Sequence, residues 1–408
     1  CLLMPLSCTS PPRTSRFFSP KTPESFASLM IRVRRCGGGL HDWPGKPGFE
    51  LENHGAADEY VHVWTRAEGK KRAGCRPAEK KRGGKGMIAD QTLRMAADRR
   101  NLLVGAACSP HLIAREPEYA QTLAREFNCL VAENCMKAAY VQPERGRFDF
   151  GPADRLVAFA EENRMRVRGH TLVWHNQMPE WMKTAGFSRE EALGVMRDHI
   201  RGVLAHFKGR VFCWDVVNEA LADGGGWRMK SPWFQMIGPD YVEAAFRFAR
   251  EADPDVLLFY NDYGMDQPGS KADECYRMVR DFLDRGVPID GVGFQYHLGV
   301  ENHLDRSACA ANVRRFRELG LAVHFTEMDM GIRKPITDEL RSQQASEYAN
   351  RVGIALDAGV SALVFWGFTD KYSWVPSFTK GEYDEPLLFD SSYRPKPAWK
   401  AVFDALAS

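Results

Sequence analysis

Side chains that could perform acid–base chemistry follow a series of short, largely apolar runs between residues 102 and 366. Glu219 comes directly after the run 211–217 and Asn218, and Glu327 comes directly after the run 322–326. Carboxylate, amide, amine, imidazole and indole side chains stand in similar places after other runs: Glu133, Asn134, Lys137, His170, Trp174, Gln177, Gln295, His297, Asp329, Trp366 and Trp374. Ordinary capping of strand ends would favour Ser, Thr and Gly instead. The repetition therefore indicates one shared site.

The types of these side chains suit a carbohydrate ligand. The flat faces of Trp side chains stack on the C–H faces of sugar rings, while carboxylates, amides and Lys bind hydroxyls through directional hydrogen bonds. Hydrolysis of a glycosidic bond requires two carboxyl groups flanking that bond, one protonated and one charged, and Glu219 and Glu327 supply such a pair. The negative charge of Glu327 favours a proton on Glu219. We expect a hydrolase that needs neither a cofactor nor a metal.

The apolar runs also predict the elements that must position these residues. Strands are predicted near 102–106, 127–132, 165–170, 211–217, 256–260, 290–294, 322–326 and 361–366, and helices over 152–163, 189–207, 241–252, 271–285, 307–319 and 337–358. Eight alternating units over about 320 residues predict an α/β fold, a (β/α)8 TIM barrel, whose active site gathers at the carboxyl ends of the strands. An open doubly wound sheet is the competing fold. No G-x-G-x-x-G turn follows the first strand, which disfavours its dinucleotide-binding version.

Residues 1–86 differ in composition from the rest of the chain. They hold sixteen Lys and Arg against eight Asp and Glu, so the remaining residues carry a formal charge of −6 within a total of +2. They show no sustained helical or strand period, and we predict that 1–86 are a disordered or artefactual extension and that 87–408 form a single catalytic domain. The acidic body, and the lack of aromatic residues interleaved with basic ones in the extension, disfavour nucleic acid as a partner.

The sequence contains no clear signal for a membrane-spanning segment, a zinc site or a redox-active cysteine pair. No run approaches the ~18 apolar residues of a membrane-spanning helix, and the opening segment does not resemble a signal peptide, so we expect no membrane partner. The ten cysteines form no CxxC pair, which disfavours zinc and thioredoxin-type sites. Cys129, Cys213 and Cys309 lie in apolar runs, where we expect small buried hydrophobic residues.

Most of the candidate residues fall within six strings that resemble the motifs of glycoside hydrolase family 10. In chain order the strings are Glu133-Asn134-Cys135-Met136-Lys137, Arg168-Gly169-His170-Thr171-Leu172-Val173-Trp174-His175, Trp214-Asp215-Val216-Val217-Asn218-Glu219, Gly293-Phe294-Gln295-Tyr296-His297, Thr326-Glu327-Met328-Asp329 and Trp366-Gly367-Phe368-Thr369-Asp370. The resemblance covers about residues 90–406. It implies a TIM barrel with endo-1,4-β-xylanase activity, which hydrolyses internal β-1,4 bonds of xylan or xylo-oligosaccharides by a retaining double displacement.

The resemblance also implies roles. Glu219 would be the acid/base and Glu327 the nucleophile, with His297 donating to Glu327, Asp329 orienting His297 and Asn218 binding the sugar 2-hydroxyl. The implied substrate-binding residues are Glu133, Asn134 and Lys137 for the next glycone sugar, His170, Gln177, Gln295, Trp366 and Trp374 around the cleaved sugar, and Trp174 as either a platform or packing. Trp374 is the candidate for crowding the space beyond C5, which would disfavour hexoses.

Three other functions stay open from the sequence alone. A β-1,4-glucanase could use the same barrel. A metal-dependent hydrolase could use His170, His175, His297 and Asp329, although the usual His-x-His pair on one strand is missing. A sugar-binding protein would keep the tryptophans but has no need for both glutamates. We expect a monomer that acts on xylan or xylo-oligosaccharides. Its location stays open, because the family default is secretion, no signal peptide is visible, and some relatives act inside the cell.

Overall fold

The computed structural model describes residues 91–408 and, before them, four short strands at residues 15–17, 26–32, 51–52 and 60–66. The chain divides into two compact units, Cys1–Gly83 and Gly84–Ser408. In the first unit the described strands are β1 (Ser15–Phe17), β2 (Phe26–Arg32), β3 (Leu51–Glu52) and β4 (Tyr60–Arg66), which pair antiparallel in the order β1-β2-β4-β3. These strands were not predicted from the sequence. Most of residues 1–86 lie outside the described residues, and that they are a disordered or artefactual extension stays a prediction.

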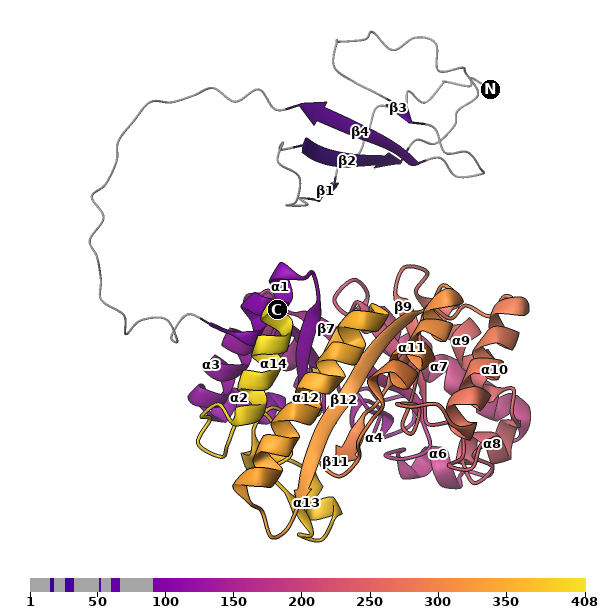
Figure 1. Ribbon diagram of the computed structural model, residues 1–408. Helices are drawn as coiled ribbons and strands as arrows, with labels where there is room; N and C mark the ends of the chain where they lie inside the picture. Colours follow the sequence, from indigo (N-terminus) through magenta and orange to yellow (C-terminus); the bar gives the residue numbers. More distant parts are fainter. Residues whose placement is uncertain (1–14, 18–25, 33–50, 53–59, 67–90) are drawn as a thin grey trace, which may run out of the picture. The chain divides into compact units, whose positions relative to one another are not determined.

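The second unit is built around eight parallel strands that close into a barrel (Figure 1). Closure is visible in the pairing, because β10 pairs with β12 and β13 pairs with the first barrel strand, β5. The strands are β5 (Leu103–Cys108), β6 (Cys129–Ala132), β7 (Arg166–Trp174), β8 (Cys213–Asn218), β9 (Leu257–Asp262), β10 (Gly291–Phe294), β12 (Ala322–Arg333) and β13 (Ala362–Phe365). They coincide with the eight predicted strands, so the predicted TIM barrel is confirmed.

Helices follow the strands and cover the outside of the barrel (Figure 1). Helix α9 shows why the sequence folds this way: Tyr241, Val242, Ala245, Phe246 and Ala249 recur at helical spacing and are all buried. The helices are α1 (Leu93–Arg99), α2 (Pro110–Arg115), α3 (Pro117–Glu126), α4 (Ala138–Val141), α5 (Gly151–Glu162), α6 (Glu180–Thr184), α7 (Arg189–Phe207), α8 (Pro232–Ile237), α9 (Tyr241–Ala252), α10 (Ser270–Asp284), α11 (Arg306–Glu318), α12 (Asp338–Ala358), the 3-10 turn η1 (Asp370–Tyr372), α13 (Val375–Phe378) and α14 (Pro397–Ala407). The six predicted helices are all present.

The layer between the barrel strands and the surrounding helices is closely packed, and the ring of Trp214 on β8 lies 6.0 Å from that of Phe207 on α7. Trp214 lies against Gly169 of the neighbouring strand so closely that a Cβ at Gly169 would come within 2.2 Å of the indole ring. Only glycine fits there, and the close approach lets a large aromatic side chain fill the core. The expected burial of Cys129, Cys213 and Cys309 is confirmed, and all three are free thiols.

Two short strands extend the barrel at the carboxyl end of β12. Strand β11 (His297–Gly299) pairs in parallel with β12 beyond the barrel proper, with His297 opposite Asp329, and β14 (Tyr383–Asp384) pairs antiparallel with the end of β12. These pairings were not predicted. In the part of the chain that the structure describes, no helix is both long and apolar enough to cross a membrane.

Candidate active site

The carboxyl ends of the barrel strands bring the predicted site residues together. Glu219 follows β8 directly, and its backbone amide donates to the carbonyl oxygen of Asn261 at the end of β9 (2.9 Å). The backbone of Glu219 has φ 58°, in the left-handed region that non-glycine residues seldom adopt. Such a conformation at a strand end turns the side chain out of the strand's regular alternation, and it is typical of functional sites.

Glu327 is a buried carboxylate with two donors. Asn261 Nδ2 donates to its Oε1 (2.7 Å), and His297 Nε2 lies 3.2 Å from its Oε2. Burial alone would raise the pKa of Glu327, but the hydrogen bond from His297, together with the positive charges of His170 and His297, lowers it to about 2. Glu327 is therefore ionised at neutral pH, as a nucleophile must be.

His297 is held between two carboxylates. Its Nδ1 lies 2.9 Å from Asp329 Oδ2, and the same oxygen accepts a hydrogen bond from Trp374 Nε1 (2.7 Å). Burial opposes the charged imidazole, but the charge of Asp329 and the hydrogen bonds to Asp329 and Glu327 raise the pKa of His297 to about 10. His297 is thus an imidazolium that donates to both neighbours at neutral pH.

Glu219 has different neighbours. Its Oε2 accepts from Trp174 Nε1 (2.8 Å), and its Oε1 accepts from Gln295 Nε2 (3.0 Å). His175 Nε2 lies 4.0 Å from Oε2. Burial lowers the pKa of His175, so this ring is neutral at pH 7 and adds no charge beside Glu219. The two glutamates therefore differ in a simple way, since only Glu327 has an imidazolium partner.

A chain of amides connects the two glutamates. Gln295 Nε2 reaches both Glu219 Oε1 and Asn218 Oδ1 (3.2 Å), while Asn261 Nδ2 reaches both Asn218 Oδ1 (2.9 Å) and Glu327 Oε1. Thr326 Oγ1 donates to Asn261 Oδ1 (2.7 Å), which fixes the orientation of that amide. The amide chain gives both carboxylates a rigid, pre-arranged set of donors, and rigid donors are what transition-state stabilisation needs.

A second cluster lies beside this pair. Lys137 Nζ donates to Gln177 Oε1 (2.7 Å) and Asn134 Oδ1 (3.2 Å), and it lies 4.9 Å from the ring centre of Trp174 and 5.6 Å from that of Trp366. Burial lowers the pKa of Lys137, although the charges of Glu327, Glu133 and Glu219 act against that fall. Burial likewise raises the pKa of Glu133, against the charge of Lys137. Amine, amide and carboxylate between two indoles form a suitable cradle for sugar hydroxyls.

Beneath these residues an ion pair stabilises the floor of the site. Arg168 and Asp215 form a fully buried, two-pronged salt bridge, and Asp215 also lies 2.9 Å from His170 Nδ1. The imidazole of His170 meets the edge of Trp366 at 5.3 Å between ring centres. His170 is thus fixed from below, and its electrostatic interaction with Glu327 helps to lower the pKa of that carboxyl group.

Every residue predicted for the site lies in one of these connected groups, and three further residues join them. Asn261 contacts Glu327 and Asn218, His175 lies near Glu219, and Arg228 Nε donates to the backbone carbonyl of Glu219 (3.0 Å). Asn261 ends a strand and His175 follows one, so the same strand-end pattern could have identified both. No sequence pattern marks Arg228, because its contact depends on how the loop after β8 folds back.

Among the donors considered for a metal-dependent hydrolase, only His297 and Asp329 contact each other, and His175 lies 4.0 Å from Glu219 instead. His170 faces Asp215, and His297 faces Glu327 and Asp329. Among residues 91–408 no group of three or more His, Cys, Asp and Glu side chains has the arrangement of a metal site. The geometry matches paired carboxylates far better than a ligand set.

Comparison with known proteins agrees with this geometry. The profile of glycosyl hydrolase family 10 matches residues 92–405. Endo-1,4-β-xylanase B of Thermotoga neapolitana is 44% identical over 319 residues, which are 77% of this chain and 91% of that protein. The crystal structure of xylanase 10B from Thermotoga petrophila in complex with xylobiose has a TM-score of 0.76 at 45% identity, and the match covers 79% of this chain and 98% of that one.

A more distant structure agrees as well. It is that of a mutant of an intracellular xylanase from Thermoanaerobacterium saccharolyticum in complex with xylotriose, with a TM-score of 0.71 at 36% identity, and the match covers 78% of this chain and 99% of that one. The family profile and these relatives span nearly all of the barrel unit. The chain belongs to glycosyl hydrolase family 10.

Proposed function

We propose that this glycosyl hydrolase is an endo-1,4-β-xylanase that cuts internal bonds of xylan and xylo-oligosaccharides with retention of the anomeric configuration. The relatives named above are xylanases, and two of the solved ones hold xylobiose or xylotriose. The observation that carries the proposal is the difference between the two glutamates. Glu327 is kept ionised by an imidazolium, and Glu219 lies across a chain of amides from it, beside neutral donors.

In the first step a carboxylate oxygen of Glu327 attacks the anomeric carbon. The bond between that carbon and the glycosidic oxygen breaks, and protonated Glu219 gives its proton to the departing oxygen. The products are a glycosyl ester on Glu327 and a free aglycone. His297 and Asn261 keep their hydrogen bonds to the Glu327 carboxyl group, which holds it in position during the attack.

In the second step Glu219 acts as the base. It removes a proton from a water molecule, the water oxygen attacks the anomeric carbon, and the ester bond to Glu327 breaks. Trp174 and Gln295 donate to the two oxygens of Glu219, which suits the ionised form that this step needs. Two inversions at one carbon leave the product with the configuration of the substrate.

Binding roles follow from the same contacts. Asn218 accepts from both Asn261 and Gln295 beside Glu219, and these contacts support its assignment as the residue that binds the 2-hydroxyl of the cleaved sugar. Glu133, Asn134 and Lys137 would bind the next sugar on the glycone side, and Gln177, which would bind the cleaved sugar, contacts Asn134 and Lys137 between the two. His170, Trp174, Trp366 and Trp374 would enclose the cleaved sugar, as would Gln295.

Substrate selection is assigned to Trp374. Its indole is fixed by the hydrogen bond to Asp329, by the ring of His297 at 5.0 Å and by Phe378 at 4.6 Å. A side chain that is held in place excludes a sugar with an added hydroxymethyl group more strongly than a mobile side chain does. We further propose that residues 87–408 are the catalytic domain and that the enzyme works as a monomer without residues 1–86.

The test is product analysis on xylan, on xylohexaose and on carboxymethylcellulose, with NMR of the first product formed. Xylo-oligosaccharides of intermediate length should appear before xylose, and the new reducing end should first appear as the β-anomer. A first product with the α-configuration would overturn the retaining mechanism, and faster cleavage of the glucan would favour the β-1,4-glucanase alternative. Activity that disappears after exhaustive chelation would favour the metal-dependent one.

A further inference from the structure

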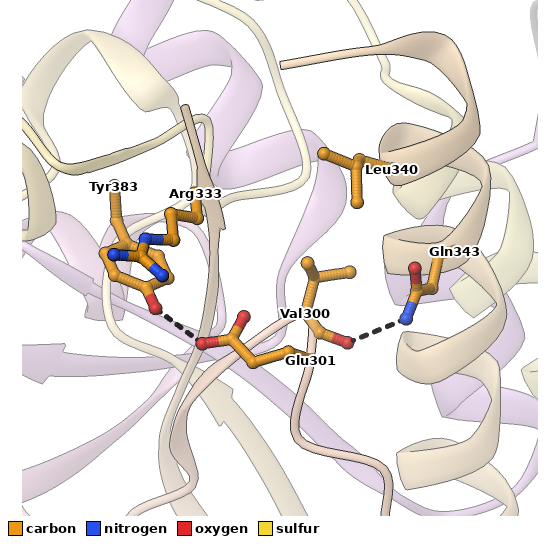
Figure 2. Close-up of a pocket in the computed structure, with 6 residues that line it drawn as sticks. All are labelled: Val300, Glu301, Arg333, Leu340, Gln343 and Tyr383. Atoms are coloured by element: carbon orange, nitrogen blue, oxygen red, sulfur yellow. Dashed lines mark hydrogen bonds between the residues drawn. The ribbon is translucent and has the colours of Figure 1, made fainter. Parts of the chain in front are cut away.

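A cavity of about 190 Å³ lies beyond the active-site residues along two of the strands that carry them. Figure 2 shows Arg333 and Tyr383 on one side of this cavity, Leu340 and Gln343 of α12 on the other, and Val300 and Glu301 between them. Val300 and Glu301 come directly after β11, Arg333 ends β12, and Tyr383 begins β14. We call these six residues the rim pocket.

The rim pocket is distinct from the site of bond cleavage. Arg333 lies six residues beyond Glu327 on β12, which corresponds to roughly 20 Å along a strand. The functional residues described above do not line it. A sugar bound there is therefore not the sugar that is cleaved.

The chemistry of the lining favours a neutral, hydroxyl-rich ligand with an apolar face. Val300, Leu340 and the ring of Tyr383 offer apolar surface, while Glu301, Gln343 and Arg333 offer acceptors and donors. The carboxylate of Glu301 and the guanidinium of Arg333 give the lining a formal charge of zero, so it does not favour a charged ligand. An aromatic ring with carboxylate, amide and guanidinium groups around it has the composition of a carbohydrate site.

Contacts within the described residues hold these groups in place. Tyr383 donates its hydroxyl to Glu301 Oε1 (2.5 Å), Gln343 Nε2 donates to the carbonyl oxygen of Val300 (3.2 Å), and Arg333 pairs with Glu382 (2.7 Å). These contacts join the loop after β11 to α12 and β14. A pocket whose side chains are already ordered loses less entropy when a ligand binds.

We infer that the rim pocket is a second binding site for xylan, which takes a neutral sugar unit of the polymer away from the cleaved bond. The inference rests on the proposed function for the identity of the sugar. A second contact on a long chain raises the effective concentration of that chain at the cleft, whereas a short substrate gains nothing from it. The rim pocket would therefore matter for polymeric xylan and not for small glycosides.

The test compares Tyr383→Ala, Tyr383→Phe and Gln343→Ala, with Arg247→Ala as the matched control on the exposed face of α9, where Arg247 pairs with Glu243. Activity is measured on an aryl β-xylobioside, which reports the site around Glu219 and Glu327 alone, and on soluble xylan. Binding is measured by affinity electrophoresis in xylan, with each change introduced into full-length Glu327→Gln so that the polymer is not degraded.

Tyr383→Ala should weaken retention by xylan and raise the KM for xylan by about threefold to tenfold, the range expected for one aromatic contact. Activity on the aryl glycoside should stay unchanged. Tyr383→Phe should retain most of the binding, because it keeps the ring. If Tyr383→Ala also changes activity on the aryl glycoside, Gln343→Ala is the variant that tests the inference. It should weaken retention by xylan and leave activity on the aryl glycoside unchanged.

Retention of both alanine variants at the level of the Arg247→Ala control would overturn the inference. Xylan binding without hydrolysis of either substrate by the unmodified enzyme would instead overturn the proposed function. The two failures are therefore distinguishable.

Discussion

His297 Nε2 lies 3.2 Å from Glu327 Oε2, and the other ring nitrogen of His297 lies 2.9 Å from Asp329 Oδ2. The imidazole thus carries its charge between two carboxylates, with a pKa of about 10, while the pKa of Glu327 falls to about 2. The pair places a cation beside the carboxylate that must remain ionised.

Replacing His297 by Asn should move the acidic limb of kcat/KM on an aryl xylobioside to higher pH. In the unmodified enzyme the depressed pKa keeps Glu327 ionised down to a pH of about 2. Without the imidazolium, burial dominates and the pKa of Glu327 rises toward or above its ordinary 4.5. The check is a full pH profile of both proteins. An unshifted acidic limb would show that His297 does not control the ionisation of Glu327.

The same pair makes two stabilising contributions, whose dependences on pH have opposite signs. The depressed pKa of Glu327 stabilises the folded state above its ordinary pKa of 4.5, and that contribution is lost as pH falls toward 2. The raised pKa of His297 stabilises the fold below its ordinary 6.5, and that contribution is lost as pH rises toward 10. The difference in melting temperature between the unmodified enzyme and His297→Asn should therefore be largest between about pH 4.5 and 6.5.

Glu219→Ala should separate the two steps of the reaction. On xylan, where the leaving group needs a proton, kcat/KM should fall by about a hundredfold to ten-thousandfold, the usual contribution of general acid catalysis. An aryl glycoside with an acidic leaving group should still form the ester on Glu327, and then hydrolyse slowly. Added azide should restore turnover and give a β-glycosyl azide, since a small anion attacks without a base. Equal losses on both substrates, with no azide product, would argue against Glu219 as the acid/base.

Asn261→Ala should damage both stability and catalysis. The change removes one of two donors from a fully buried carboxylate and also one of the donors to Asn218. A hydrogen bond to a charged group contributes about 1.5 to 3 kcal/mol, so the free energy of unfolding at pH 7 should fall by about that amount. Denaturant unfolding and kcat measured on the same preparation check this. Asn312→Ala is the matched control, because Asn312 is a buried asparagine that donates to Met265 outside the site. It should reduce stability but leave kcat unchanged.

The sequence predicted the barrel well because buried parallel strands are short apolar runs, and each of the eight strands could be predicted from its own residues. The same strand assignments also identified the polar residues at the strand ends. The pairing of β11 with the extension of β12 beyond the barrel could not be predicted from the sequence, because no local pattern marks it. Nor does a local pattern show that Asn261 reaches across to Glu327, or that Glu219 adopts a left-handed backbone. Both depend on neighbours far away in the chain.

Deleting residues 1–86, so that the chain begins at Met87, should leave kcat/KM on xylan within about twofold of the full chain. All the proposed site residues lie between Glu133 and Trp374, in the unit Gly84–Ser408. Activity and melting temperature of the two proteins check this together. A large loss of activity with an unchanged melting temperature would show that the first 86 residues contribute to function.

Trp374→Ala should narrow the preference for xylan over a soluble β-1,4-glucan. The two polymers differ at each unit by one hydroxymethyl group, and the Trp374 indole, fixed by Asp329, His297 and Phe378, is the wall proposed to crowd it. A group of this size changes specificity by about 1 to 3 kcal/mol, so the ratio of kcat/KM values should fall by roughly tenfold or more. Part of the change should come from weaker xylose binding. Phe378→Ala is the comparison, since Phe378 is exposed and its ring packs against the indole of Trp374. Phe378→Ala should leave the Trp374 indole less firmly held. It should lower the ratio of kcat/KM values for xylan and glucan by a smaller factor than Trp374→Ala does. A ratio that Trp374→Ala leaves unchanged would place the filter elsewhere in the site.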